Sequence, residues 1–155
     1  MKKNNRKKVL KNRKAFFMYT IIERVEAGIV LVGTEIKSIR EGKVSFKDSY
    51  ARFHGLELFL EGLYIAPYKH GTYSNHEPER QRKLLLHKKE LKRLRGKVEE
   101  RGCTIVPLFI YITKNLAKVE IGLVKGKRLF DRREEIKKRD LQREMQRDFK
   151  ERYKR

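Results

Sequence analysis

The stretch from residue 26 to residue 40 constrains the fold of this chain most, because its hydrophobic period changes once along it. Between Gly28 and Gly33 the residues are continuously apolar, a pattern that predicts a buried β-strand. Beyond Gly33 the apolar residues Ile36 and Ile39 lie three positions apart with charges around them, which predicts a short amphipathic helix. The segment therefore predicts a strand that passes directly into a helix.

The ends and the charged face of this helix follow from the same residues. Thr34 is a suitable N-cap, and Gly42 is a suitable residue to end the helix. We expect Glu35, Lys37 and Arg40 to lie on the open face of the helix. Such charges usually do no more than contact solvent, and the alternative is that they belong to a binding surface.

Several other segments have the composition or the alternation of strands. They are residues 17–22, 49–53, 56–63, 103–113 and 119–123. The adjacent apolar pair Ile21 and Ile22 predicts a bulge or bend in the first of these strands, and Lys114 and Asn115 predict a tight turn between the last two. Together the strands and helices predict a mainly β fold, an OB-type antiparallel β-barrel of about six strands with two to three short helices.

The balance of charge constrains the partner. The 155 residues carry 41 Lys and Arg against 20 Asp and Glu, a formal net charge of +21. This excess predicts a polyanionic partner, with nucleic acid the first candidate and an anionic membrane surface the second. No apolar run approaches the roughly 20 residues that span a bilayer, and no signal-peptide core follows the basic N-terminus. Since the single cysteine excludes an internal disulfide, we expect a cytoplasmic protein without a membrane partner.

Two basic segments lack the periodicity of helices and strands. Residues 1–14 contain lysines and arginines but no acid, which predicts a disordered arm that is either merely solvated or in contact with phosphates. Residues 68–83 form a long loop in which Tyr68 and Tyr73 alternate with cations. That mixture is typical of RNA-binding loops, because aromatic rings stack on bases, although an exposed insertion in a basic protein has the same composition.

The spacing of leucines predicts a longer helix after this loop. Residues 84–86 are three leucines that we expect to enter the helix, and because one helix face cannot bury all three, one is expected to be exposed. Leu91, Leu94 and Val98 then form a narrow apolar stripe among cations, and Gly102 is a suitable residue to end the helix.

The last segment, residues 129–155, has the composition of a helix but little apolar surface. Its stripe of Leu141, Met145, Phe149 and Tyr153 recurs every four residues and is too thin to pack firmly. We therefore predict a basic tail that is disordered or frayed until it becomes helical against a partner. A coiled-coil strand is the alternative, although a spacing of four is not a heptad.

The sequence offers little chemistry for catalysis. The four histidines share no metal-ligand spacing, and one cysteine cannot build a zinc site. Residues 122–128 are too short a stretch for a phosphate loop, and Arg128 stands where a magnesium-binding hydroxyl would be required. We therefore expect no metal, no cofactor and no enzymatic activity.

Eight short stretches occur in the order found in a known family. They are residues 12–15, 26–28, 33–40, 48–50, 65–68, 82–87, 116–122 and 125–127. The most distinctive is Gly33-Thr-Glu-Ile-Lys-Ser-Ile-Arg. From Asn12 onward the chain resembles the small protein B family, the SsrA-binding proteins of bacteria. So many ordered matches are more specific than any one motif.

This resemblance implies a fold and a function. Residues 15–128 would form an OB-type barrel that binds the tRNA-like domain of transfer-messenger RNA and delivers this RNA to stalled ribosomes, in trans-translation. The tail would become helical in the empty mRNA channel. Elongation factor Tu and alanyl-tRNA synthetase would act on the same RNA. A ribosomal or general structured-RNA-binding protein has the same composition and is the alternative, and an RNA-modifying enzyme is a third possibility.

The resemblance also implies which residues bind. For RNA these are Asn12, Tyr19, Glu26, Leu85 and His87, to which the charges nearby in the sequence add Glu35, Lys37, Arg40, Arg82, Lys83 and Lys88. For the ribosome they are Gly126, Lys127, Arg128, Asp131, Arg132 and Arg133. Two positions depart from the family pattern: Phe130 replaces a histidine of many members, and His87 replaces an asparagine of some.

A carboxylate on a phosphate-binding surface requires hydrogen-bond donors. Glu26 could accept from a base edge of the RNA. Alternatively it could accept from Arg24 or Arg40 and orient the guanidinium group. The sequence leaves both possibilities open.

Overall fold

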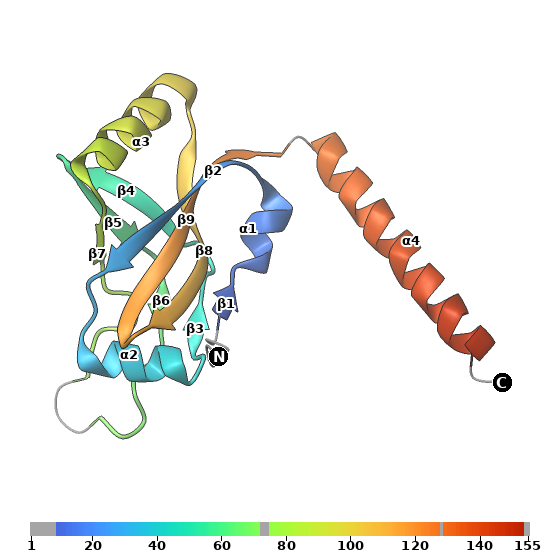
Figure 1. Cartoon of the computed structure of the whole chain (residues 1–155), viewed down its shortest axis with the longest axis horizontal. Helices are drawn as coiled ribbons and strands as arrows, with labels where there is room; N and C mark the ends of the chain where they lie inside the picture. The colour runs from blue at the N-terminus through green and yellow to red at the C-terminus, as the bar shows by residue number, and fades with distance from the viewer. Residues whose placement is uncertain (1–8, 72–74, 128, 154–155) are drawn as a thin grey trace, which may run out of the picture.

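The computed structural model describes residues 9–71, 75–127 and 129–153 (Figure 1). Its strands are β1 (Val9–Lys11), β2 (Tyr19–Ile29), β3 (Val44–Ser45), β4 (Tyr50–His54), β5 (Glu57–Glu61), β6 (Tyr64–Ile65), β7 (Arg82–Leu85), β8 (Thr104–Thr113) and β9 (Leu116–Gly126). Its helices are α1 (Arg13–Met18), α2 (Gly33–Arg40), α3 (Lys88–Arg101) and α4 (Leu129–Tyr153).

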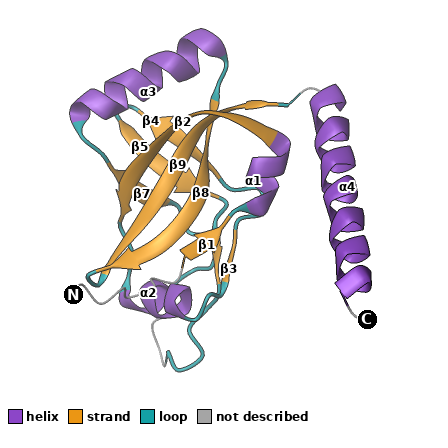
Figure 2. Ribbon diagram, turned by 45° about the vertical axis from the view of Figure 1, so that its right-hand side comes forward, coloured by secondary structure: helices purple, strands orange, loops and turns teal. Residues whose placement is uncertain are grey.

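The larger sheet closes on itself. Its strands pair in the order β8, β4, β5, β7, β2 and β9, and β9 pairs again with β8, so the described strands complete a six-membered antiparallel ring (Figure 2). The contact between β4 and β8 consists of Ala51 opposite Ile105. β1 adds to β8, and β3 pairs with β6 in a small separate sheet. The prediction of a mainly β, antiparallel fold with short helices is confirmed.

Alternate side chains of the ring fill its interior. Leu58, Leu60, Ile110 and Val119 are completely buried, because strand alternation turns every second residue inward. Leu94 of α3 joins this core at one end of the ring, and Ile39 of α2 joins it at the other, where the two helices lie in both views (Figures 1 and 2). A smaller cluster forms on the outside of β8 and β9, where α1 packs. As predicted, β8 is therefore buried on both faces over much of its length.

The turns agree with the sequence where glycine or a short turn was predicted. Lys114 and Asn115 both have positive φ, 48° and 62°, as a two-residue hairpin turn requires. The register between β2 and β9 shifts between Ile21 and Glu23, which confirms the bulge. Gly102 ends α3 with φ of 62°, and Gly42, with φ of 75°, follows the last turn of α2.

The boundary of the N-terminal arm was predicted incorrectly. The structure shows residues 9–11 as a strand paired with β8, and Asn12 caps the α1 helix, so order begins well before residue 15. Residues 1–8 lie outside the described part of the chain. The first long strand correspondingly begins at Tyr19 rather than Phe17. Pairing with β8 stabilises this basic segment, and periodicity within the segment cannot reveal such pairing.

Two helix starts also differ from the prediction. The N-cap of α2 is Val32, and Thr34 lies within the first turn. α3 begins only at Lys88, because residues 82–85 pair as β7 between β5 and β2. A short apolar run fits a strand or a helix equally well, and here the neighbouring strands decide.

The C-terminal segment is a continuous helix, whereas the sequence predicted a disordered or frayed tail in the free protein. Its residues favour helix, and at 25 residues α4 exceeds the length at which isolated helices are marginal, about 12–15 residues. The predicted thin stripe is exposed, from 54% at Leu141 to 75% at Tyr153. Figure 1 shows α4 extending away from the sheet. Among the described residues, no helix is both long and apolar enough to cross a membrane.

Candidate nucleic-acid interface

Four adjacent strands bring side chains into one row on the outer surface of the ring. Tyr111 on β8 lies opposite Lys118 on β9. Lys118 also lies opposite Gly28 on β2, which in turn lies opposite Leu85 on β7. Residues directly opposite each other share a face of the sheet, and so do residues two apart along a strand. Glu26, two residues before Gly28, therefore lies on the same face as this row. We call this face the β2 face; it comprises Glu26, Gly28, Leu85, Tyr111 and Lys118.

Glu26 is held by two donors on this face. The hydroxyl of Tyr111 donates to one carboxylate oxygen, and Nζ of Lys118 donates to the other at 2.9 Å. The side chain of Glu26 is nevertheless 52% exposed, so the held carboxylate still meets solvent. The carboxylate is thereby partly neutralised and fixed in direction.

The two arginines anticipated from the sequence each have a contact with another residue. Nη1 of Arg24 lies 3.6 Å from a carboxylate oxygen of Glu120, and Cζ of Arg24 lies 5.3 Å from the ring centroid of Phe16. Arg40 donates to the amide oxygen of Asn115 at 3.1 Å. Burial, followed by the hydrogen bond to Glu26, raises the pKa of Tyr111 well above its ordinary value, so its hydroxyl remains a donor at all physiological pH values.

Leu85 and His87 continue the β2 face toward α3. Leu85 is 52% exposed while Leu84 is buried, which confirms that one of the three leucines is open to solvent. A Cβ atom placed on Gly28 would lie 3.2 Å from Cβ of Leu85, so the glycine provides the room in which Leu85 packs. His87 is the exposed N-cap of α3, and its backbone N–H donates to the carboxylate of Glu90.

Lys83 and Lys88 lie beside these residues. Lys83 is partly exposed and its Nζ donates to Glu57 at 3.0 Å. Lys88 is exposed at the first position of α3. The structure therefore places Glu26, Lys83 and Leu85 on one face of the sheet, and the exposed His87 and Lys88 follow Leu85 at the start of α3.

The next two candidates, Lys37 and Arg40, belong to helix α2. Both are exposed on α2, at the end of the ring opposite α3 (Figures 1 and 2). The ammonium group of Lys37 lies 5.2 Å from the ring centroid of Tyr68. The structure therefore separates these two cations from His87 and Lys88. Tyr73, the other aromatic residue of the loop, lies outside the described residues.

Glu35 and Arg82 were predicted incorrectly as RNA contacts, because both side chains are completely buried. They form an ion pair with each other, and Arg80 also donates to Glu35. Burial alone would raise the pKa of Glu35, but hydrogen bonds from the N–H of Val32 and from the two arginines outweigh it and lower the pKa below its ordinary range. The pair joins α2 to β7 and is structural.

Asn12 is likewise buried rather than available to RNA. Its amide NH₂ donates to the carbonyl of Pro107 at 2.7 Å, and its amide oxygen accepts from the N–H of Ala15 at 3.3 Å. Its own backbone N–H donates to the carbonyl of Leu108. Asn12 therefore links α1 to β8, and its contribution to any RNA contact is indirect.

The expected ribosome-binding residues lie where β9 leads into α4. Tyr19, an expected RNA contact, is half-buried beside α1 and lies opposite the exposed Gly126, away from Leu85 and His87 along the sheet. Nζ of Lys127 contacts Glu135 and donates to the carbonyl of Phe16. Arg132 is partly buried and Arg133 is exposed. Arg128 lies outside the described residues, and Phe130 and Asp131 are described only as part of the α4 backbone.

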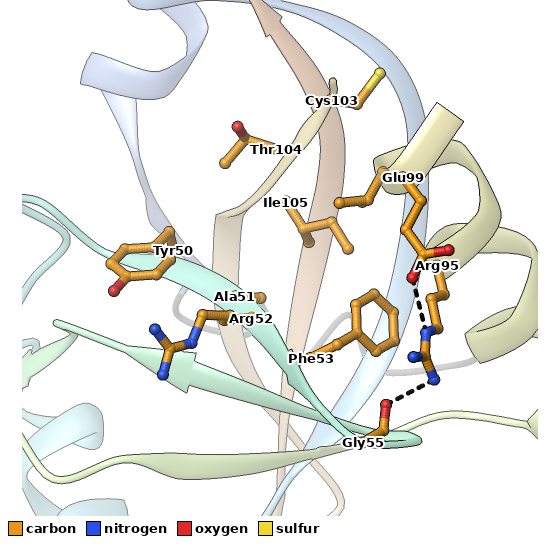
Figure 3. A pocket seen from close by; sticks show the side chains of 11 residues that line it. Tyr50, Ala51, Arg52, Phe53, Gly55, Arg95, Glu99, Cys103, Thr104 and Ile105 are labelled. Carbon is orange, nitrogen blue, oxygen red and sulfur yellow. Dashed lines mark hydrogen bonds and ion pairs between the residues drawn. The ribbon is translucent and has the colours of Figure 1, made fainter. Parts of the chain in front are cut away.

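A pocket lies between β4 and the end of α3 (Figure 3). Its lining is mainly apolar, with Phe53 and Ile105 at its centre. The guanidinium group of Arg95 already has acceptors, since it donates to Glu99 at 3.1 Å and to the carbonyl of Gly55 at 2.9 Å. In the part of the chain that the structure describes, no group of three His, Cys, Asp or Glu residues is placed to hold a metal ion.

Sequence reasoning did not select Tyr111, Lys118 or Gly28. One signal was available: a two-residue turn at Lys114 and Asn115 places Tyr111 directly opposite Lys118. The register of β2 against β9, which brings Glu26 to this pair, has no signal in local periodicity.

Comparison with known proteins identifies the family. The family model described as SmpB protein matches residues 9–151. The SsrA-binding proteins of Syntrophobacter fumaroxidans and Aquifex aeolicus are each 55% identical to this chain, covering 90% and 92% of it and 86% and 91% of their own lengths. A chain of the solved structure "tmRNA-SmpB: a journey to the center of the bacterial ribosome" is 58% identical, with a TM-score of 0.67 over 78% of this chain and 85% of that one. This chain therefore belongs to the SmpB family.

Proposed function

We propose that this protein is an RNA-binding adaptor that binds the tRNA-like domain of transfer-messenger RNA and delivers it to stalled ribosomes in trans-translation. The observation that carries the proposal is the β2 face, which presents Glu26 and Leu85 on one exposed surface, with the exposed His87 at the start of the helix that follows β7. A held carboxylate accepts from base edges, an exposed leucine packs on an unstacked base, and the surrounding lysines contact phosphates. The curated relatives carry the name SsrA-binding protein, which supports the same RNA.

The C-terminal helix has a second role in this proposal. α4 enters the empty mRNA channel of the ribosome, with Gly126, Lys127, Arg128, Asp131, Arg132 and Arg133 at its entrance. Supporting this role, α4 is mostly exposed and carries cations along its whole length. Elongation factor Tu and alanyl-tRNA synthetase act on the same RNA, and the process takes place in the cytoplasm. The SmpB family consists of RNA-binding adaptors, so we assign no enzymatic activity.

The experiment measures binding to the tRNA-like domain, to an ordinary tRNA and to a plain RNA duplex over a salt series. Phosphate contacts alone predict similar affinities and similar steep salt slopes for all three. We expect the tRNA-like domain to keep its affinity as salt rises, and Glu26→Gln and Leu85→Ala to reduce that preference. Glu41→Gln and Leu141→Ala change exposed residues of the same kinds away from the β2 face and serve as controls. If the affinities for the three RNAs fell in parallel as the salt concentration rises, a ribosomal or general RNA-binding protein would be favoured instead.

A further inference from the structure

A groove between β7 and the first turns of α3 adjoins the β2 face. Its volume is about 550 Å³, within the range of small-ligand sites, and its lining is mainly apolar. Leu56, in the turn between β4 and β5, and Leu85 are its most exposed apolar members, at 73% and 52%. Leu85 belongs to both surfaces, so the groove and the β2 face are continuous.

The cations beside the groove differ from the other cations of α3. Arg93 and Lys97 both contact Glu23 at 2.6 Å and so hold α3 on β2. Lys88 and Lys92, by contrast, line the groove, and neither has an acidic partner within the described chain. The acid of the groove, Glu57, already accepts from Lys83.

The position of these two lysines is unfavourable for the helix itself. Lys88 occupies the first position of α3, where the helix dipole repels a cation. Lys92 follows four residues later, so the two like charges are neighbours on one helix face. A bound anion between them would relieve both repulsions, while the apolar lining below would remain available to a flat, weakly polar group.

We propose that this groove binds one unstacked nucleotide of the RNA. The base packs on Leu56, Leu85 and Leu91, and its flanking phosphates lie between Lys88 and Lys92. The proposal rests on the proposed function, since the strand that supplies this nucleotide continues from the RNA on the β2 face. An RNA strand is favoured over an acidic peptide because of that continuity and because the two cations border an apolar lining on which a base can pack.

The test uses the full chain and the tRNA-like domain carrying 2-aminopurine at one loop position at a time. At one position we expect the fluorescence of 2-aminopurine to increase several-fold on binding, because the base leaves its stack. Leu56→Ala should abolish that increase. Lys92→Gln should weaken binding about three- to tenfold and reduce the salt slope by about one phosphate contact. Lys89→Gln, on the same helix but outside the groove lining, is the matched control.

The outcomes separate this proposal from the function on which it rests. If Leu56→Ala and Lys92→Gln bind like the wild type while Glu26→Gln loses its preference, the groove proposal is overturned and the proposed function stands. If the wild type does not distinguish the three RNAs, the proposed function itself fails. If the groove variants bind the tRNA-like domain normally but lose co-sedimentation with ribosomes, the occupant is a part of the ribosome and not a nucleotide of this RNA, and the proposal is overturned.

Discussion

Tyr111 and Glu26 lie on strands separated by β9, yet the hydroxyl of Tyr111 donates a hydrogen bond to the carboxylate of Glu26. Lys118, on the intervening strand, donates to the other oxygen. A carboxylate can accept about four hydrogen bonds, so one that is held in this way can also accept from RNA in a fixed direction. Tyr111 and Lys118 are therefore positioning residues for Glu26.

The variant Tyr111→Phe tests this role of the hydroxyl. Because one hydrogen bond to a half-exposed carboxylate is lost, we expect the affinity for the tRNA-like domain to fall about threefold, roughly 0.7 kcal/mol, with little change for duplex RNA. Tyr50→Phe, which removes the hydroxyl that contacts Glu61 on β5, is the control. In a double-mutant cycle Tyr111→Phe should have no further effect in the Glu26→Gln background, and additive losses would contradict a shared role.

The variant Gly28→Ala tests the packing of Leu85. Its Cβ atom would lie 3.2 Å from Cβ of Leu85, so β7 or the leucine must shift by a few tenths of an ångström. We expect the stability to fall by about 1 kcal/mol or less and the RNA affinity to fall several-fold. Gly96→Ala, in α3 with nothing near the added atom, should instead stabilise the protein by up to about 1 kcal/mol. Unchanged RNA binding by Gly28→Ala would show that the position of Leu85 does not matter.

The buried ion pair of Glu35 and Arg82 predicts the acid sensitivity of the fold. The folded-state pKa of Glu35 lies below its ordinary value of 4.5, so its stabilising contribution is fully present above that value. The contribution is lost as the pH falls below 4.5 and through the lower, folded-state pKa. Glu35→Gln should lower the free energy of unfolding at pH 7 by about 3 kcal/mol, because Arg82 remains buried without its counter-charge. It should also flatten the acid limb, by which we mean the decline of the free energy of unfolding as the pH falls below 4.5.

Urea unfolding at a series of pH values between 7 and 3 measures both effects. Glu41→Gln removes an exposed carboxylate one residue beyond the same helix and should leave the acid limb unchanged. An acid limb of equal steepness in Glu35→Gln and the wild type would show that other groups determine it.

The contacts of α4 predict two classes of backbone amide. Near its start Arg132 lies 3.9 Å from the sulfur of Met18, and Arg139 lies 5.3 Å from the ring centroid of Phe17. Beyond that point the stripe residues are exposed. Hydrogen exchange should therefore be slower over residues 132–140 than over residues 145–153, and Phe17→Ala should accelerate the first group only. Uniform exchange along α4 would mean that its contacts with α1 do not stabilise it.

Local pattern was sufficient for the parts of this protein that neighbouring residues determine. The turn at Lys114 and Asn115, the bulge after Ile21 and the end of α3 at Gly102 each depend on a few adjacent residues, and each was predicted. The exposure of one leucine among residues 84–86 was also predicted, although from a helix face, whereas Leu84 and Leu85 face opposite sides because they belong to a strand. The order of the eight matching stretches along the sequence was likewise enough to recognise the family.

Only the tertiary structure decided where the charges lie. Glu35 has the sequence context of an exposed helix face, yet Arg82, 47 residues away, compensates its charge and allows complete burial. Glu26 receives its donor from Tyr111, 85 residues away, through the register of two intervening pairings. Periodicity reports which side of its own element a residue occupies, whereas the partner that makes a buried or held charge stable is supplied by another element. For that reason the sequence by itself determined the mainly β class, the local turns and the family, and the folded chain determined which of the candidate residues are exposed and which are buried.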